Sequence, residues 1–102
     1  MNKNSRDKLS LSVVVTATNG NASLKLCLES LFRQVTRDDT EVIVVSNFDS
    51  GPAESRCRHI PTIKFDHFPE MTTIPELRAA GVSRSSGEII ALLEDHCTAD
   101  KN

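Results

Sequence analysis

The fold is decided by residues 73–96, which read TIPELRAAGVSRSSGEIIALLEDH. Thr73 and Glu76 have the spacing of a capping box, in which the threonine hydroxyl accepts a hydrogen bond from an amide three residues on and the glutamate reaches back. Pro75 suits the first helical turn. A helix is therefore predicted to begin at Thr73, and the Ser-Ser-Gly run at residues 85–87 is predicted to end it.

After this helix comes a predicted strand that ends in three polar side chains. Residues 88–93, EIIALL, form a short apolar run of the kind that is buried on both faces of a parallel sheet. Glu94, Asp95 and His96 follow where the strand leaves the sheet. Two acids and an imidazole at such a point suit a metal site, whereas a solvated acidic loop is the simpler alternative.

The residues before this stretch show the same alternation of strand and helix. Residues 11–15 (LSVVV) and 41–46 (EVIVVS) are predicted to be buried strands. A shorter strand is predicted at residues 61–65, with proline at its start as on an edge strand. Asn21 is the predicted N-cap of a helix between the first two strands. The apolar residues of that helix recur at helical spacing: Leu24, Cys27, Leu28, Leu31 and Val35.

Alternating strands and helices of this length predict a three-layer α/β/α domain with a mostly parallel sheet and right-handed crossovers. If the second and third strands extend the sheet on one side of the first, and the fourth pairs on its other side, the strand order is 3-2-1-4. A switch point then lies between strands one and four, and ligands bind beyond the carboxyl ends of strands at such a point. The site is therefore predicted between residues 16–19 and 94–96, with residues 46–49 beside it.

Composition narrows the class of protein. The 102 residues suit one domain, predicted at residues 11–102 after a polar tail at residues 1–10, and 38% hydrophobic with 25% charged residues is ordinary for a folded chain. A net charge of -2 argues against nucleic acid as a partner. There is no apolar run of signal-peptide or membrane-spanning type, and three widely spaced cysteines favour a reducing compartment. A cytoplasmic location is predicted.

Four segments, in this order and at these intervals, resemble the family 2 glycosyltransferases of the GT-A fold. They are residues 11–19 (LSVVVTATN), 27–34 (CLESLFRQ), 41–50 (EVIVVSNFDS) and 76–96, and the resemblance covers nearly all of residues 11–102. It implies the Rossmann-like, nucleotide-sugar-binding half of a GT-A domain. Such a domain binds a nucleoside diphosphate sugar through the base, the ribose and a divalent metal that bridges the diphosphate.

The resemblance also implies roles for individual residues. His96 occupies the position of the metal-binding acid, with Glu94 as a further metal ligand, and an imidazole favours Mn²⁺ over Mg²⁺. Glu94 and Asp95 occupy acidic positions that contact the ribose or metal-bound water. The nucleotide-binding residues that the resemblance implies are Thr16, Thr18, Ser46, Asn47, Arg78, Glu94 and Asp95.

At some positions the chain departs from the family pattern. Ala79 stands where the family has asparagine, and Ser46 with Asn47 stands where the family has the acid that reads the base. An uncharged side chain can still hydrogen-bond a pyrimidine edge, but the preference for uridine is left open.

Structural alternatives exist for two of the implied contacts. Arg78 can instead pair with Glu76 or another acid at the helix surface. Thr16 and Thr18 can instead satisfy backbone amides in a turn.

The resemblance implies inverting transfer to an acceptor hydroxyl, which needs a general base. In the family this base lies downstream of the metal motif, and the chain ends six residues after His96. We therefore expect the isolated chain to be incomplete as an enzyme: either it is a fragment or a truncated gene product, or another chain completes it. Whether a second copy of the chain covers the exposed strand edge by self-association is left open. The alternative is a nucleotide- or partner-binding module without turnover. A dinucleotide-binding oxidoreductase is disfavoured, because residues 16–21 lack the GxGxxG pattern.

Overall fold

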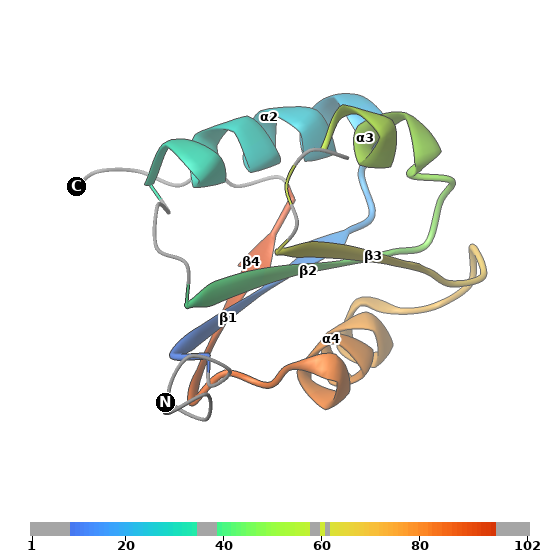
Figure 1. Cartoon of the computed structure of the whole chain (residues 1–102). Helices are drawn as coiled ribbons and strands as arrows, with labels where there is room; N and C mark the ends of the chain where they lie inside the picture. The colour runs from blue at the N-terminus through green and yellow to red at the C-terminus, as the bar shows by residue number, and fades with distance from the viewer. Residues whose placement is uncertain (1–8, 35–38, 58–59, 61, 96–102) are drawn as a thin grey trace.

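The computed structural model describes residues 9–34, 39–57, 60 and 62–95, which form one sheet with helices on both faces (Figure 1). Helices α2 and α3 lie on one face and α4 lies on the other, so the predicted three-layer α/β/α architecture is confirmed. In chain order the elements are β1 (Leu11–Ala17), α2 (Gly20–Gln34), β2 (Thr40–Ser46), α3 (Gly51–Arg56), β3 (Ile63–His67), α4 (Ile74–Arg84) and β4 (Ile89–Glu94).

The sheet has the predicted order, β3-β2-β1-β4, and every neighbouring pair is parallel. Strand β1 lies between β2 and β4, with Leu11 opposite both Thr40 and Ile89. Because the strands are parallel, their carboxyl ends meet at one edge of the sheet. The chain passes from β1 through α2 to β2 on one side, and it returns from β3 through α4 to β4 on the other side of β1. The topological switch point predicted between β1 and β4 is therefore present.

Several element boundaries differ from the prediction by one or two residues. Strand β1 continues through Thr16 and Ala17, because both still have ladder partners in β2. Helix α2 begins at Gly20, one residue before the predicted cap Asn21. The Asn21 side chain instead donates its amide to the Asp49 carbonyl at 3.0 Å, which ties α2 to the loop before α3.

Helix α4 begins with the predicted capping box. The Glu76 amide donates to the Thr73 hydroxyl at 3.3 Å, and the Glu76 carboxylate accepts from the Thr73 amide at 2.9 Å. The Thr73 amide and the Thr73 hydroxyl both donate to the Glu76 carboxylate, and these two hydrogen bonds lower the pKa of Glu76. Further along the helix, a β-carbon at Gly81 would lie 2.3 Å from Val14 Cγ1, so glycine is what allows α4 to approach the sheet so closely.

The two faces of the sheet bury separate hydrophobic clusters. The larger cluster lies beneath α2 and α3 and includes Val13, Val15, Leu24, Leu28 and Val44. The smaller cluster lies beneath α4 and consists of Val14, Ile43, Val45 and Leu77, with Phe68 packed against it. Alternate residues of β1 thus serve both clusters, as a strand that is covered on both faces requires.

Strand β4 does not have the predicted burial on both faces. Ile89 is 66% exposed and Leu92 is 51% exposed, so this prediction is wrong. The reason is position: β4 is the outermost strand of the described sheet, and the main contacts of α4 are with β1 and β2. None of the described helices is long and apolar enough to span a membrane.

Candidate functional site

Polar residues from neighbouring strands meet at the carboxyl edge of the sheet. Thr16 of β1 lies opposite Glu94 of β4, and the Asp95 amide donates to the Thr16 carbonyl at 3.0 Å. Ser46 ends β2 opposite Ala17. The structure therefore brings together the ends of β1, β2 and β4, which are the three segments predicted to form the site. His96 lies outside the described residues, so its predicted role as a metal ligand is not tested by the structure.

Arg78 reaches this edge from α4. Its guanidinium forms an ion pair with the Glu94 carboxylate, and the two side chains are 40% and 28% exposed. The alternative that Arg78 pairs with an acid is therefore correct, and the partner is a predicted site residue rather than Glu76. Since a solvent-accessible pair contributes only about 0–1 kcal/mol, a diphosphate can compete for the guanidinium at little cost.

Asp95 fixes the loop that follows β1. Its carboxylate accepts from the Asn19 amide at 3.0 Å and from the Asn19 side-chain nitrogen at 2.7 Å. Asp95 is 2% exposed, and Asn19 immediately precedes α2. This carboxylate holds the end of β4 against the start of α2, so it sets the spacing between the loops that border the site. Asn19 was not among the predicted nucleotide-binding residues, although it lies in the predicted turn at residues 16–19.

Ser46 and Asn47 stabilise two further loops. Ser46 is fully buried, and its hydroxyl donates to the Phe48 carbonyl at 3.0 Å. The Asn47 side-chain nitrogen donates to the Thr72 carbonyl at 3.1 Å, which links the loop after β2 to the start of α4. Both donors are thus used within the protein. No described residue donates to the Asn47 side-chain oxygen, so this oxygen can accept a hydrogen bond from a ligand.

Thr16 contains a buried hydroxyl with an unmet hydrogen bond. Its Oγ1 atom has no hydrogen-bond partner within the part of the chain that the structure describes, although the residue is only 2% exposed. An unpaired buried polar group costs about 1–3 kcal/mol. Its position opposite Glu94 makes it a group that a bound ligand can satisfy, and Thr18, two residues on, is half-buried at the same edge.

The carboxylate groups at this edge are of the kind that bind divalent cations. Glu94 and Asp95 supply carboxylate oxygens, and the imidazole of His96 follows directly in the sequence. Within residues 9–34, 39–57, 60 and 62–95, no group of three histidine, cysteine, aspartate or glutamate side chains could hold a metal ion. The role of His96 and Glu94 as metal ligands therefore stays a prediction from the sequence.

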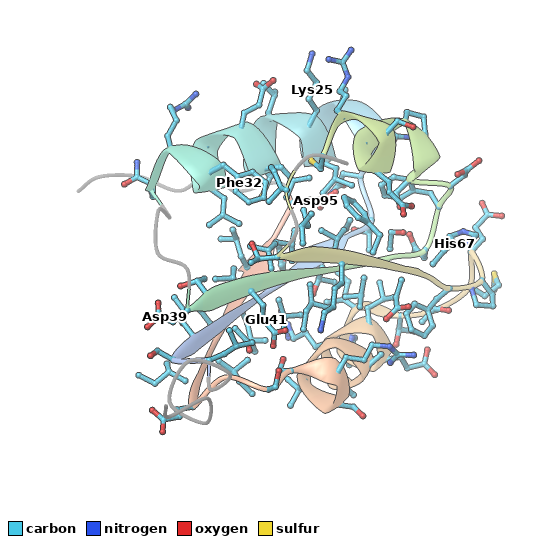
Figure 2. The ribbon with its side chains drawn as sticks, in the orientation of Figure 1. Lys25, Phe32, Asp39, Glu41, His67 and Asp95 are labelled. Carbon is cyan, nitrogen blue, oxygen red and sulfur yellow. The ribbon has the colours of Figure 1, made fainter. Side chains whose placement is uncertain are left out.

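A second polar cluster lies at the opposite, amino end of the strands, where Glu41 is 2% exposed. Figure 2 labels Glu41 and Asp95, which mark the two ends of the sheet. The Glu41 carboxylate accepts from the Ser12 hydroxyl at 2.6 Å, from the Ser86 amide at 2.7 Å and from the Lys64 ammonium at 3.3 Å. Burial raises the pKa of Glu41, but these hydrogen bonds outweigh burial, so the pKa lies below its ordinary value.

Residues 12–102 match the family model of Glycosyl transferase family 2. The structure is that of a glycosyltransferase domain with the GT-A fold. Since the match includes most of the chain, the protein belongs to glycosyl transferase family 2.

Two crystal structures of S. aureus TarS share this fold. Residues 1–349 of TarS match with a TM-score of 0.79 and 17% identity, over 91% of this chain and 29% of that one. A second TarS structure matches with a TM-score of 0.77 and 17% identity, over 92% of this chain and 18% of that one. The chain thus spans less than a third of either TarS chain. None of the curated proteins matches this sequence.

Proposed function

We propose that this chain is the donor-binding half of a glycosyltransferase. It binds a nucleoside diphosphate sugar at the carboxyl ends of β1, β2 and β4, for inverting transfer of the sugar to an acceptor hydroxyl. The observation that supports this most is the meeting of Thr16, Arg78 and Glu94 at the switch point of a parallel sheet. The acceptor site and the general base belong, in this proposal, to polypeptide outside the chain, since TarS is more than three times as long.

His96 and Glu94 are the residues that would hold a divalent metal, with Mn²⁺ favoured by the imidazole. When bound, such an ion supplies Lewis-acid stabilisation of the charge that develops on the departing diphosphate. The same carboxylate pairs with Arg78 in the structure described here, so Glu94 connects the proposed metal position with the guanidinium.

In this proposal, different residues of the chain contact the phosphates and the base of the donor. Arg78 has the planar, multiply donating head that matches phosphate oxygens, and it would leave Glu94 in part to contact them. Thr16 and Thr18 would contact the base, where the Thr16 hydroxyl would gain its missing partner. Asn47 would offer its side-chain oxygen to the base, while Asp95 keeps the loop after β1 in place.

The test is a titration of the chain with UDP, GDP, CDP and ADP, each with and without Mn²⁺. One nucleotide is expected to bind best, Mn²⁺ to raise its affinity, and His96→Ala to remove that gain. His67→Ala is the matched control, because His67 is an exposed histidine on β3, which β2 and β1 separate from Glu94 on β4. Equal nucleotide affinity with and without Mn²⁺ in the unaltered chain would contradict the metal site.

A second candidate function is a nucleotide-binding module that has no turnover. The observation in its favour is that the chain spans only 29% of the first TarS structure. Donor hydrolysis and transfer by the isolated chain distinguish the two candidates. Release of sugar from a bound donor supports the enzyme, whereas tight donor binding without any release supports the binding module.

A further inference from the structure

An apolar pocket lies in the seam between α2 and α3. Its volume is about 310 Å³, near the lower end of the range for small-ligand sites. Leu28 and Phe32 line it from α2, Ala53 lines it from α3, and Cys57, the C-cap of α3, and Ile60 line it beyond that helix. None of the predicted donor-site residues lines this pocket, so it is a separate feature of the fold.

A smaller hollow of about 200 Å³ adjoins this pocket and shares Lys25, Ala53 and Arg56 with it. Asn21 and Pro52 place the hollow beside the first turns of α2 and α3. Its described lining contains two cationic side chains and no acid. The amino end of the fifteen-residue helix α2 adds partial positive charge at the same place.

Charge and apolar surface are therefore separated along the seam. Glu29 is the acid that lines the larger pocket, and it is absent from the lining of the smaller hollow. Figure 2 shows Lys25 extending outward from α2 and Phe32 lying on its inner side. Burial raises the pKa of the Cys57 thiol, so this side chain stays neutral and acts as part of the apolar wall. A ligand that fits has an anionic head and an unbranched apolar tail.

We propose that the α2–α3 seam is a binding site for single-chain anionic amphiphiles of the medium-chain carboxylate class. The carboxylate lies between Lys25 and Arg56, and the hydrocarbon chain follows the seam past Phe32 to Cys57 and Ile60. Apolar contact supplies most of the affinity, and the two cations select the charge of the head group. This site is independent of the proposed donor site.

The first experiment is an NMR titration of the ¹⁵N-labelled chain with hexanoate, octanoate and decanoate below their micelle concentrations. Saturable shifts are expected at the amides of Leu28, Ala53 and Cys57, and each added methylene should raise affinity about fourfold until the pocket is filled. Decyltrimethylammonium, with the same chain and the opposite charge, should bind more weakly. Equal binding of the ammonium compound, or shifts that gather at Ile89 and Leu92 of β4, would overturn the proposal.

The second experiment tests the head-group contacts. The double variant Lys25→Gln, Arg56→Gln should lose about fivefold in decanoate affinity, because two partly exposed charge pairs are removed, and should bind 1-decanol as the unaltered chain does. Arg33→Gln is the matched control, since Arg33 lies on the same helix and outside both linings. The same loss in the control would overturn the assignment of the head group.

The third experiment separates free amphiphiles from membranes and from the donor site. Vesicles that contain an anionic phospholipid should leave the seam amides unshifted, whereas decanoate shifts them. Binding to vesicles without saturable decanoate binding would overturn the proposal in favour of a membrane surface. Arg78→Ala should leave decanoate affinity unchanged, so that failure of the donor site and failure of this site give different results.

Discussion

The two ends of the sheet contain similar polar residues, and Asp95 at the carboxyl end is as fully hydrogen-bonded as Glu41 at the amino end, but the ends differ in their other groups. At the amino end, the buried Glu41 carboxylate is surrounded by donors from Ser12, Ser86 and Lys64. At the carboxyl end, Thr16 has a buried hydroxyl without a partner in the described residues, and Arg78 is paired with Glu94 in an exposed position. A completed network stabilises the fold, whereas an incomplete one leaves groups for a ligand. Residue type alone does not distinguish the two ends.

The largest effect on stability is expected from Glu41→Ala. This change leaves the Ser12 hydroxyl and the Ser86 amide without their buried acceptor, so the free energy of unfolding should fall by about 3 kcal/mol. Urea denaturation measures the loss. Glu29→Ala, which removes an exposed carboxylate on α2, is the control and should change stability by about 0.5 kcal/mol or less. Equal losses in the two variants would contradict the distinction between the ends.

A somewhat smaller loss is expected from Gly87→Ala, which adds one methyl group at the amino end. The new β-carbon would lie 2.7 Å from the backbone of Leu11 and Ser12, and the Gly87 amide donates to the Ser12 hydroxyl at 2.8 Å. Because backbone must move, the cost should be about 2 kcal/mol. The denaturation midpoint measures it, with Gly51→Ala as a control, since that β-carbon would approach only the Asp49 side chain. An unchanged midpoint in Gly87→Ala would show that the connection before β4 is not tightly held.

The next largest effect on stability is expected from low pH, which protonates Glu41 at the amino end of the sheet. The pKa of Glu41 is lowered in the folded chain, so its contribution to stability is complete above the unfolded pKa and is lost as the pH falls through the folded pKa. The urea midpoint of the unaltered chain should therefore fall more steeply on acidification than that of Glu41→Gln. Glu76, whose pKa is also lowered, is present in both proteins and cancels in the comparison. Parallel pH profiles would contradict the assignment to Glu41.

The smallest effect on stability, with the clearest effect on binding, is expected from Arg78→Ala at the carboxyl end. The Arg78–Glu94 pair is partly exposed, so unfolding should change by less than about 1 kcal/mol. Nucleotide affinity should fall about tenfold, because a charge-assisted contact to phosphate is lost. Calorimetric titration measures this, and Arg33→Ala is the control. A large loss of stability with unchanged affinity would place Arg78 in the structure rather than in the site.

The fold was largely predictable from the sequence, because hydrophobic periodicity and one capping box determined most elements. The run at residues 41–46 predicted β2, and Thr73 with Glu76 predicted the start of α4. Strand β4 was misjudged, since an apolar run indicates that a strand is suited to burial and does not reveal whether an element covers it. The exposed Ile89 and Leu92 depend on the neighbours of the strand, which the local sequence does not contain.

The site was predictable in position and less so in detail. The trailing residues of β1 and β4 meet as expected, because parallel strands deliver their carboxyl ends to one edge. The bonds of Asp95 to Asn19 and of Ser46 to Phe48 could not be predicted, since they depend on loop conformations that residue type does not determine. Glu41 appeared only as the first residue of an apolar run, and its donors come from distant segments of the chain.

The placement of β4 next to β1 has a consequence for how the chain reaches its native state. The Ser12–Gly87 and Asn19–Asp95 hydrogen bonds join residues 75 and 76 positions apart, one pair at each end of the same two strands. Closing so long a loop is entropically costly until many contacts form together, and topologies rich in such contacts fold slowly. During synthesis β1, β2 and their helix emerge first, so we expect the β1–β4 ladder, which completes the switch point, to be the last part of the sheet to assemble.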